Sequence, residues 1–146
     1  MDDKSPNARF KEAREQLGLS LDDLAFQCDV PPTAIRDIEW FSDDLICCYS
    51  PHDLQKFCRA LKIRPIELFA PEFSELAVST DELIQLIHEE CRSRQISLDQ
   101  FEEAVGWYLS NCMDPPERLL PDMSIDGLQW LCRELHLDWR RVILGL

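Results

Sequence analysis

The chain has 146 residues, of which 45% are hydrophobic and 29% charged, and its formal net charge is −13. This apolar content is sufficient for a packed core, and the length allows one domain or two small ones. No apolar run approaches the roughly 18 residues that a membrane-spanning helix requires, and the acidic start Met-Asp-Asp-Lys does not resemble a signal peptide. We therefore expect a cytoplasmic protein that does not contact membranes.

The cysteines and histidines do not indicate a metal or cofactor site. The seven cysteines include no Cys-x-x-Cys pair, and His52, His88 and His136 are not close in sequence to a cysteine cluster with the ligand spacing of zinc sites. An odd number of cysteines without pairing is typical of reduced thiols. We expect no metal and no cofactor.

Helical periodicity dominates the chain and no strand-like alternation persists, which predicts an all-α fold. The first expected helix has Phe10 and Leu17 on one face and ends at Gly18. Ser20 is placed as the N-cap of a second helix. A third helix, residues 31–39, opens with two prolines, where a missing N–H costs little.

The next part of the chain completes a first unit. Residues 40–49 read as an irregular segment, after which Ser50 caps a fourth helix. Pro65 begins a fifth, short helix. We interpret residues 1–70 as one five-helix domain and residues 71–80 as a linker.

The pattern then returns in residues 81–146. Ile96–Phe101 echoes Leu19–Leu24 at an offset of 77 positions, and Leu128–Leu135 echoes Leu54–Leu61 at an offset of 74 positions. Two matches in the same order indicate a tandem duplication. The alternative is a coincidence between amphipathic helices, which share composition. Residues 71–146 carry most of the negative charge, −9 against −4 for residues 1–70, and are a poor surface for a polyanion.

The stretch from Gly18 to Glu39 resembles the Cro/repressor-type (Xre) helix-turn-helix family, matching its pattern at Ser20, at Leu24-Ala25 and at Val30. The resemblance implies two tandem lambda-repressor-like five-helix domains, the second of them degenerate. It also implies a partly buried ion pair between Arg14 and Glu39, whose role is to hold the first helix against the third.

In such a domain the helix at residues 31–39 would contact DNA. Thr33 and Arg36 are the expected base-reading residues, because arginine suits a guanine edge. Arg9 and Lys11 are expected to contribute to a basic face beside them. The family often has a phosphate-contacting glutamine at the position of Leu21, so one of its contacts is absent here.

The segment after this helix is acidic and apolar where family members carry basic and small residues. One interpretation is an exposed apolar patch that binds a protein partner. The other is a loop whose apolar side chains fold back onto the core. The candidate partner-binding residues are Trp40, Phe41, Leu45, Ile46 and Tyr49.

Two functions follow from this reading. The first is a transcription regulator that binds DNA through residues 31–39 and dimerises through its second half. The alternative is an acidic protein-binding module on a repressor scaffold, such as an antitoxin, an immunity protein, an anti-repressor or a DNA mimic. An enzyme is not expected, since no nucleophile, base and orienting residue group together and four glycines form no phosphate-binding loop.

Overall fold

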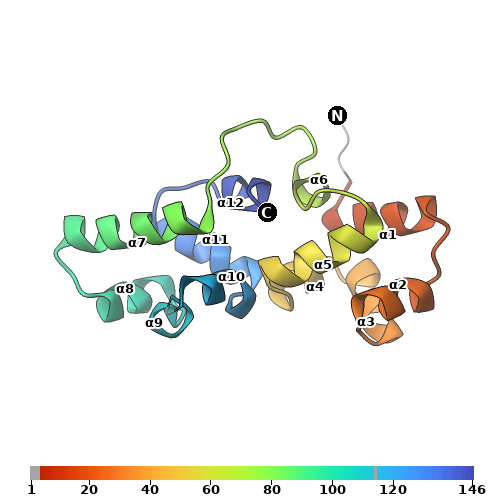
Figure 1. Cartoon of the computed structure of the whole chain (residues 1–146), viewed down its shortest axis with the longest axis horizontal. Coiled ribbons are helices and arrows are strands. Elements are labelled where there is room, and N and C mark those ends of the chain that lie inside the picture. The colour runs from red at the N-terminus through yellow and green to blue at the C-terminus, as the bar shows by residue number, and fades with distance from the viewer. Residues whose placement is uncertain (1–3, 114) are drawn as a thin grey trace.

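The computed structural model describes residues 4–113 and 115–146, which form helices joined by loops and turns, with no strand. Two helical halves lie end to end along the long axis of the molecule (Figure 1). The first half contains α1 (Pro6–Gln16), α2 (Leu21–Cys28), α3 (Pro32–Trp40), α4 (Asp44–Cys47), α5 (Pro51–Leu61) and α6 (Ile66–Phe69). The second contains α7 (Thr80–Arg94), α8 (Leu98–Val105), α9 (Leu109–Cys112), the 3-10 helix η1 (Pro116–Arg118), α10 (Leu119–Asp122), α11 (Ile125–Glu134) and α12 (Arg140–Leu144).

Serine hydroxyls cap five of the helices, although Ser5 before α1 makes no such bond. Each capping hydroxyl accepts a hydrogen bond from the backbone N–H three residues later, which satisfies one of the donors left free at a helix start. The N-cap roles expected for Ser20 and Ser50 are confirmed, each in a reciprocal capping box with an aspartate. The capping serines are Ser20, Ser50, Ser79, Ser97 and Ser124, which begin α2, α5, α7, α8 and α11.

Helix ends recur at matching positions in the two halves. Asp29 after α2 and Gly106 after α8 both adopt left-handed backbone conformations, with φ of 55° and 81°. Lys62 after α5 and His136 after α11 do the same, with φ of 57° and 53°. These pairs are separated by the same 77 and 74 positions that separate the sequence matches.

The first half differs from the expected five helices because residues 40–49 are partly ordered as α4. Leu45 on this helix is completely buried. The linker also differs slightly from the sequence boundary, since α7 begins at Thr80. Within the linker Val78 is buried, and its N–H donates to the carbonyl of Arg141 at 2.9 Å, so this segment is anchored on α12.

The two halves pack directly on each other. Helix α4 packs against α11, α5 against α10, and α6 against α12. The N–H of Ile125 donates to the carbonyl of Tyr49 at 3.0 Å across this contact. The rings of Phe69 and Trp139 meet edge to face with centroids 5.1 Å apart. The core therefore continues from one half into the other.

Candidate nucleic-acid interface

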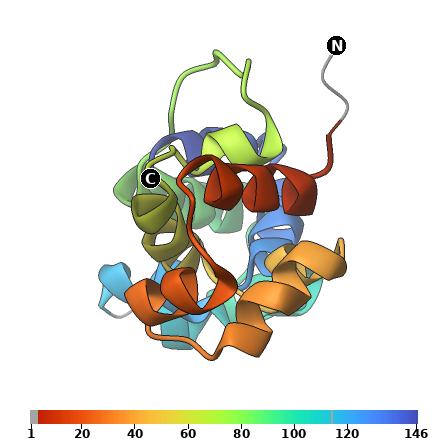
Figure 2. The ribbon, with the colours of Figure 1, turned by 90° about the vertical axis from the view of Figure 1, so that its right-hand side faces the viewer.

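Helices α1, α2 and α3 form one end of the molecule, which Figure 2 shows from outside. Helix α2 ends at the left-handed Asp29, which turns the chain sharply. Pro31 is the N-cap of α3 and Pro32 its first residue, where the absent N–H would have had no helical partner. Buried Leu24 and Ile35 lie in the core beneath these two helices.

An ion pair between Arg14 and Glu39 fixes α3 against α1. Arg14 Nε lies 2.5 Å from Glu39 Oε1, and Nη2 donates to Oε2 at 3.1 Å. Arg14 Nη1 also donates to the carbonyl of Leu19, and Asn7 donates to the carbonyl of Glu39. The hydrogen bond with Glu39 raises the pKa of the Arg14 guanidinium, against the opposing effect of burial. The ion pair expected from the sequence is thus present, at the junction of three helices.

The outer face of α3 carries Thr33, Arg36 and Trp40, all exposed. Ile35 and Ile38 occupy its inner face and are fully buried. The Arg36 guanidinium lies over the Trp40 ring at 5.6 Å from the centroid. Thr33 and Arg36 are therefore positioned to meet a ligand that approaches α3 from solvent.

The surrounding cations are fewer than the sequence suggested. Arg9 is half-buried, and its Nη1 donates to the carbonyls of Leu68 and Phe69 at 3.1 and 3.2 Å. These bonds satisfy carbonyls at the end of α6, so the structure gives Arg9 a structural role in place of the expected surface one. Lys11 is exposed on α1, in agreement with a place on the surface.

Negative charge surrounds Arg36. It is the only lysine or arginine between Gly18 and Asp44, a stretch with seven aspartates and glutamates. Asp37 Oδ1 lies 3.4 Å from Arg36 Nη2. The pKa of Asp23 is lowered mainly by a hydrogen bond that its carboxylate accepts from the backbone N–H of Ser20, and further by a hydrogen bond with the Ser20 side chain. This carboxyl is therefore ionised at neutral pH. A polyanion at α3 would meet Arg36 with the Asp37 carboxylate beside it.

The comparison with known proteins supports a helix-turn-helix at this end of the molecule. Residues 10–39 match the sequence model of the helix-turn-helix family. Residues 10–39 form a helix-turn-helix unit. The match covers most of α1, all of α2 and α3 up to Glu39. No curated protein and no solved structure matches the chain. None of the described helices is long and apolar enough to cross a membrane.

The apolar segment beyond the helix-turn-helix unit is divided between core and surface. Trp40 and Phe41 are exposed by 68% and 56%. Leu45 is buried and Ile46 is half-buried, so they do not form the exposed patch that the sequence suggested. Tyr49 is half-buried too, with its ring edge to face with Phe57 at 5.1 Å. The prediction of an exposed patch was wrong for Leu45, which α4 turns inward.

One exposed aromatic residue was missed from the sequence. Phe26 on α2 is 88% exposed, the most exposed of the large hydrophobic side chains. Phe26 follows buried Ala25 and precedes Asp29 by three residues, so it lies on the polar side of an amphipathic helix. This helical pattern would have identified Phe26 as an exposed residue from the sequence. Phe26 in the helix-turn-helix unit and Trp40 and Phe41 directly after it thus face solvent.

The second half also contains two consecutive short helices joined by a turn. Helix α8 begins at the cap Ser97 and turns at Gly106 into α9, which ends at Cys112 before the two prolines. Helix α9 has only four residues. No lysine or arginine occurs from residue 96 to residue 117. A hollow of about 460 Å³ here is lined by Asp99, Glu102, Glu103, Gly106, Trp107 and Tyr108.

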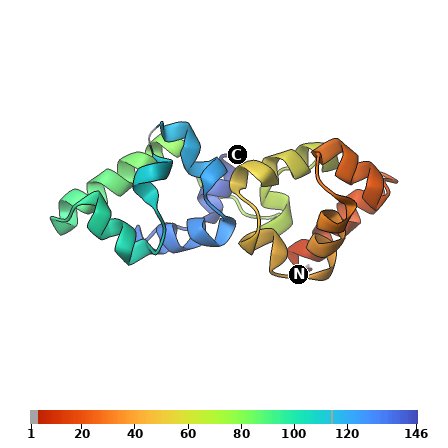
Figure 3. The ribbon, with the colours of Figure 1, turned by 90° about the horizontal axis from the view of Figure 1, so that it is seen from below.

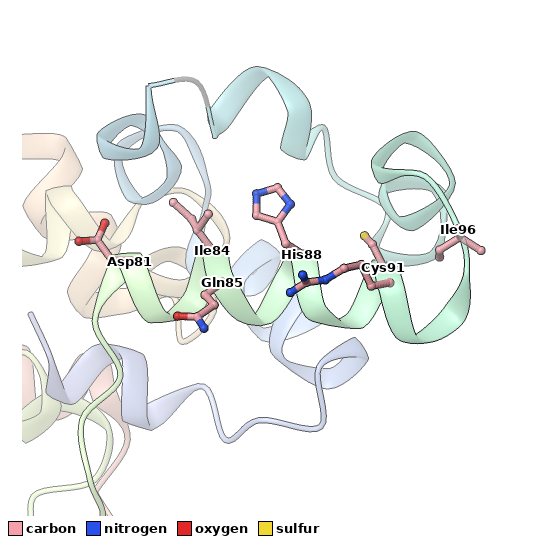
Figure 4. Close-up of a pocket in the computed structure, with 7 residues that line it drawn as sticks. Asp81, Ile84, Gln85, His88, Cys91 and Ile96 are labelled. Atoms are coloured by element: carbon pink, nitrogen blue, oxygen red, sulfur yellow. The ribbon is translucent and has the colours of Figure 1, made fainter.

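Another hollow, of about 520 Å³, lies along α7. Its lining residues follow one face of α7, with Asp81 at the start of the helix and His88 two turns later (Figure 4). No group of three or more metal-ligating residues occurs among the described residues. Burial raises the pKa of the Cys58 and Cys132 thiols to about 12, which makes them poor nucleophiles.

Proposed function

We propose that the protein is a DNA-binding transcription regulator of the Xre type that presents α3 to the major groove. The observation that carries this proposal is the exposure of Thr33 and Arg36 on a helix locked in place by Arg14 and Glu39. A helix that enters the groove needs a fixed orientation, because base contacts depend on the position of each side chain. The buried ion pair supplies that orientation.

Arg36 is the residue we assign to base recognition. An arginine donates two parallel hydrogen bonds to the O6 and N7 atoms of guanine. The neighbouring Trp40 ring supports the guanidinium by a cation–π contact at 5.6 Å. Asp37 competes for the same donors at 3.4 Å, a long contact that a guanine can replace.

We also propose that the second half is a degenerate copy of the first. The support is the recurrence of capping serines and left-handed helix ends at fixed offsets of 77 and 74 positions. In this copy α9 is too short to present a reading face, and no basic side chain accompanies it. DNA contact is therefore assigned to the first copy alone.

Selection from a random duplex pool, followed by affinity measurement on the enriched sequence, tests this function. Arg36→Ala is expected to lower affinity by about 1–3 kcal/mol and to relax the preference at one base pair. Arg64→Ala is the control, because the Arg64 side chain is also exposed, by 69% against 44% for Arg36, but its ion-pair partner is Glu67 on α6. Enrichment of no sequence, or equal loss from both variants, would contradict the proposal.

A second candidate is an acidic protein-binding module, favoured by the exposure of Phe26, Trp40 and Phe41 among carboxylates. Aromatic residues ringed by polar groups are common at the centres of protein interfaces. Such a module would act as an antitoxin, an immunity protein, an anti-repressor or a DNA mimic. Capture of a partner that Phe41→Ala abolishes, together with absence of DNA binding, would favour this function over the first.

A further inference from the structure

The contact between the two halves has the reciprocal form of a symmetric dimer interface. Helices α5 and α11 begin 74 positions apart, as do α6 and α12, and α4 and α10 occupy the places before α5 and α11. Helix α4 packs on α11, and α5 packs on α10. Since α10 corresponds to α4 and α11 to α5, these two contacts are equivalent under an exchange of the halves. Helix α6 packs on its own counterpart, α12. In a two-fold dimer, every contact recurs in this way.

The arrangement in space agrees with the contacts. Figure 3 shows the halves meeting in the middle of the molecule, with α1–α3 and α7–α9 at opposite ends. Figure 1 shows α2–α3 and α8–α9 on the same side of the molecule, and α6, α12 and the linker on the other. The helix-turn-helix unit and its counterpart therefore lie on one side, as the two units of a DNA-binding dimer do.

One hydrogen bond breaks the reciprocity. Ile125 N–H donates to the carbonyl of Tyr49. The equivalent bond in the opposite direction would run from the N–H of residue 51 to the carbonyl of Met123. These positions lie 74 residues from Ile125 and Tyr49, respectively. Residue 51 is proline, which has no N–H. The hydrogen bond therefore forms in one direction only. The contact fits two halves of different sequence better than two identical copies.

The segment between the halves strengthens the same contact. The Arg140 guanidinium lies over the Phe73 ring at 4.7 Å, and Arg141 Nε donates to the carbonyl of Leu76 at 2.7 Å. A Cβ atom added at Gly145 would lie 2.8 Å from the carbonyl oxygen of Val78, so α12 and the linker approach as closely as a glycine allows. These contacts fix the linker on α12, the helix that packs on α6.

We propose that residues 81–146 occupy the surface on which a second copy of residues 1–70 would pair, so that the protein is a monomer that binds a single DNA half-site. The surface formed by α4, α5 and α6 is covered by α10, α11 and α12 and is closed to another chain. The half-site statement rests on the proposed DNA-binding function, whereas the monomer statement does not. This replaces the homodimer expected from the sequence by an internal pairing.

Sedimentation equilibrium of the full chain over a wide concentration range tests the monomer. The expected mass is 17.1 kDa throughout. A stable species of twice this mass would overturn the inference. Trp139→Ala, which removes the edge-to-face contact with Phe69, is expected to lower the unfolding midpoint and to allow self-association at high concentration. Tyr108→Ala, an exposed aromatic outside the contact, is the control and should stay monomeric. Behaviour of Trp139→Ala identical to the control would also contradict the internal pairing.

DNA stoichiometry tests the half-site on the selected duplex. One protein per duplex is expected, and an inverted second site about 34 Å away should give independent binding without cooperativity. Cooperative binding of two copies would overturn this inference and leave the DNA-binding function intact. Failure to bind any duplex would instead overturn the function and the half-site with it, while the sedimentation result would still decide the monomer.

Discussion

At the scale of single residues, the Arg14–Glu39 pair is the contact on which the reading helix most depends. The exposed fraction of the Glu39 side chain is 3% and that of Arg14 is 11%, so each charge has little water to replace its partner. A buried pair adds little net stability against an apolar pair, but loss of one partner leaves an uncompensated charge. We infer that the pair orients α3. Its disruption should therefore lower the stability of the fold, and any loss of DNA contact would follow from that.

Arg14→Ala is expected to reduce the free energy of unfolding by about 3–5 kcal/mol, because it leaves the Glu39 carboxylate unpaired. Urea titration followed by circular dichroism measures this loss. Arg14→Met combined with Glu39→Met should recover much of it, since neither charge remains buried. A neutral effect of Arg14→Ala, or a double variant no better than the single one, would refute the role of the pair.

The site could be predicted from the sequence only where its contacts follow the family pattern. Arg14, Glu39, Thr33 and Arg36 lie within or beside the matched segment, and the structure places them at one end of the molecule. Arg9 was misplaced because its acceptors lie about 60 residues later, on α6. A contact at such separation leaves no local pattern in the sequence.

At the scale of helices, local chemistry was predictable and packing was not. The caps at Ser20 and Ser50 depend on residues three positions away, so the sequence contains the whole interaction. Helix α4 has four residues, too few for a helical period to appear. Leu45 is buried because α4 packs on α11, a helix about 80 positions later. Its burial could not be read from its neighbours.

The junction of α8 and α11 gives a prediction at this scale. A Cβ atom at Gly127 would lie 3.0 Å from Met123 Cγ and 3.1 Å from Trp107 Cε3. Gly127→Ala should therefore destabilise the protein by about 1–2 kcal/mol, overpacking outweighing the gain in helix propensity. Thermal unfolding measures the change. In a Trp107→Ala background, Gly127→Ala should cost less stability, because the ring that its Cβ would meet is gone. Additive effects of the two substitutions would argue against the clash.

Helix α12 gives a second prediction, on acid stability. Hydrogen bonds from Arg140 lower the pKa of Asp138 below its ordinary value of 3.8. Its contribution to stability is therefore complete above the ordinary pKa and is lost as pH falls through the lowered one. Asp138→Asn and Arg140→Met should both flatten the fall in stability on acidification. An unchanged acid limb in both variants, measured by urea unfolding across pH, would contradict this assignment.

At the scale of the whole molecule, the charge and the fold favour different ligands. The net charge of −13 opposes DNA, whereas the helix-turn-helix unit presents Arg36 on an exposed face. With few phosphate-contacting cations, binding must depend on base contacts more than on counterion release. The sequence offsets predicted two similar units, but not their mutual pairing, because a repeat says nothing about which faces meet.

The most direct test of the central claim is fluorescence anisotropy with the selected duplex at about 50 mM and about 200 mM salt. We predict saturable binding with a weak salt dependence, a slope corresponding to about one or two phosphate contacts, and loss of the sequence preference in Arg36→Ala. Binding that is absent at the lower salt concentration, or that Arg36→Ala leaves unchanged, would contradict a DNA-reading role for α3.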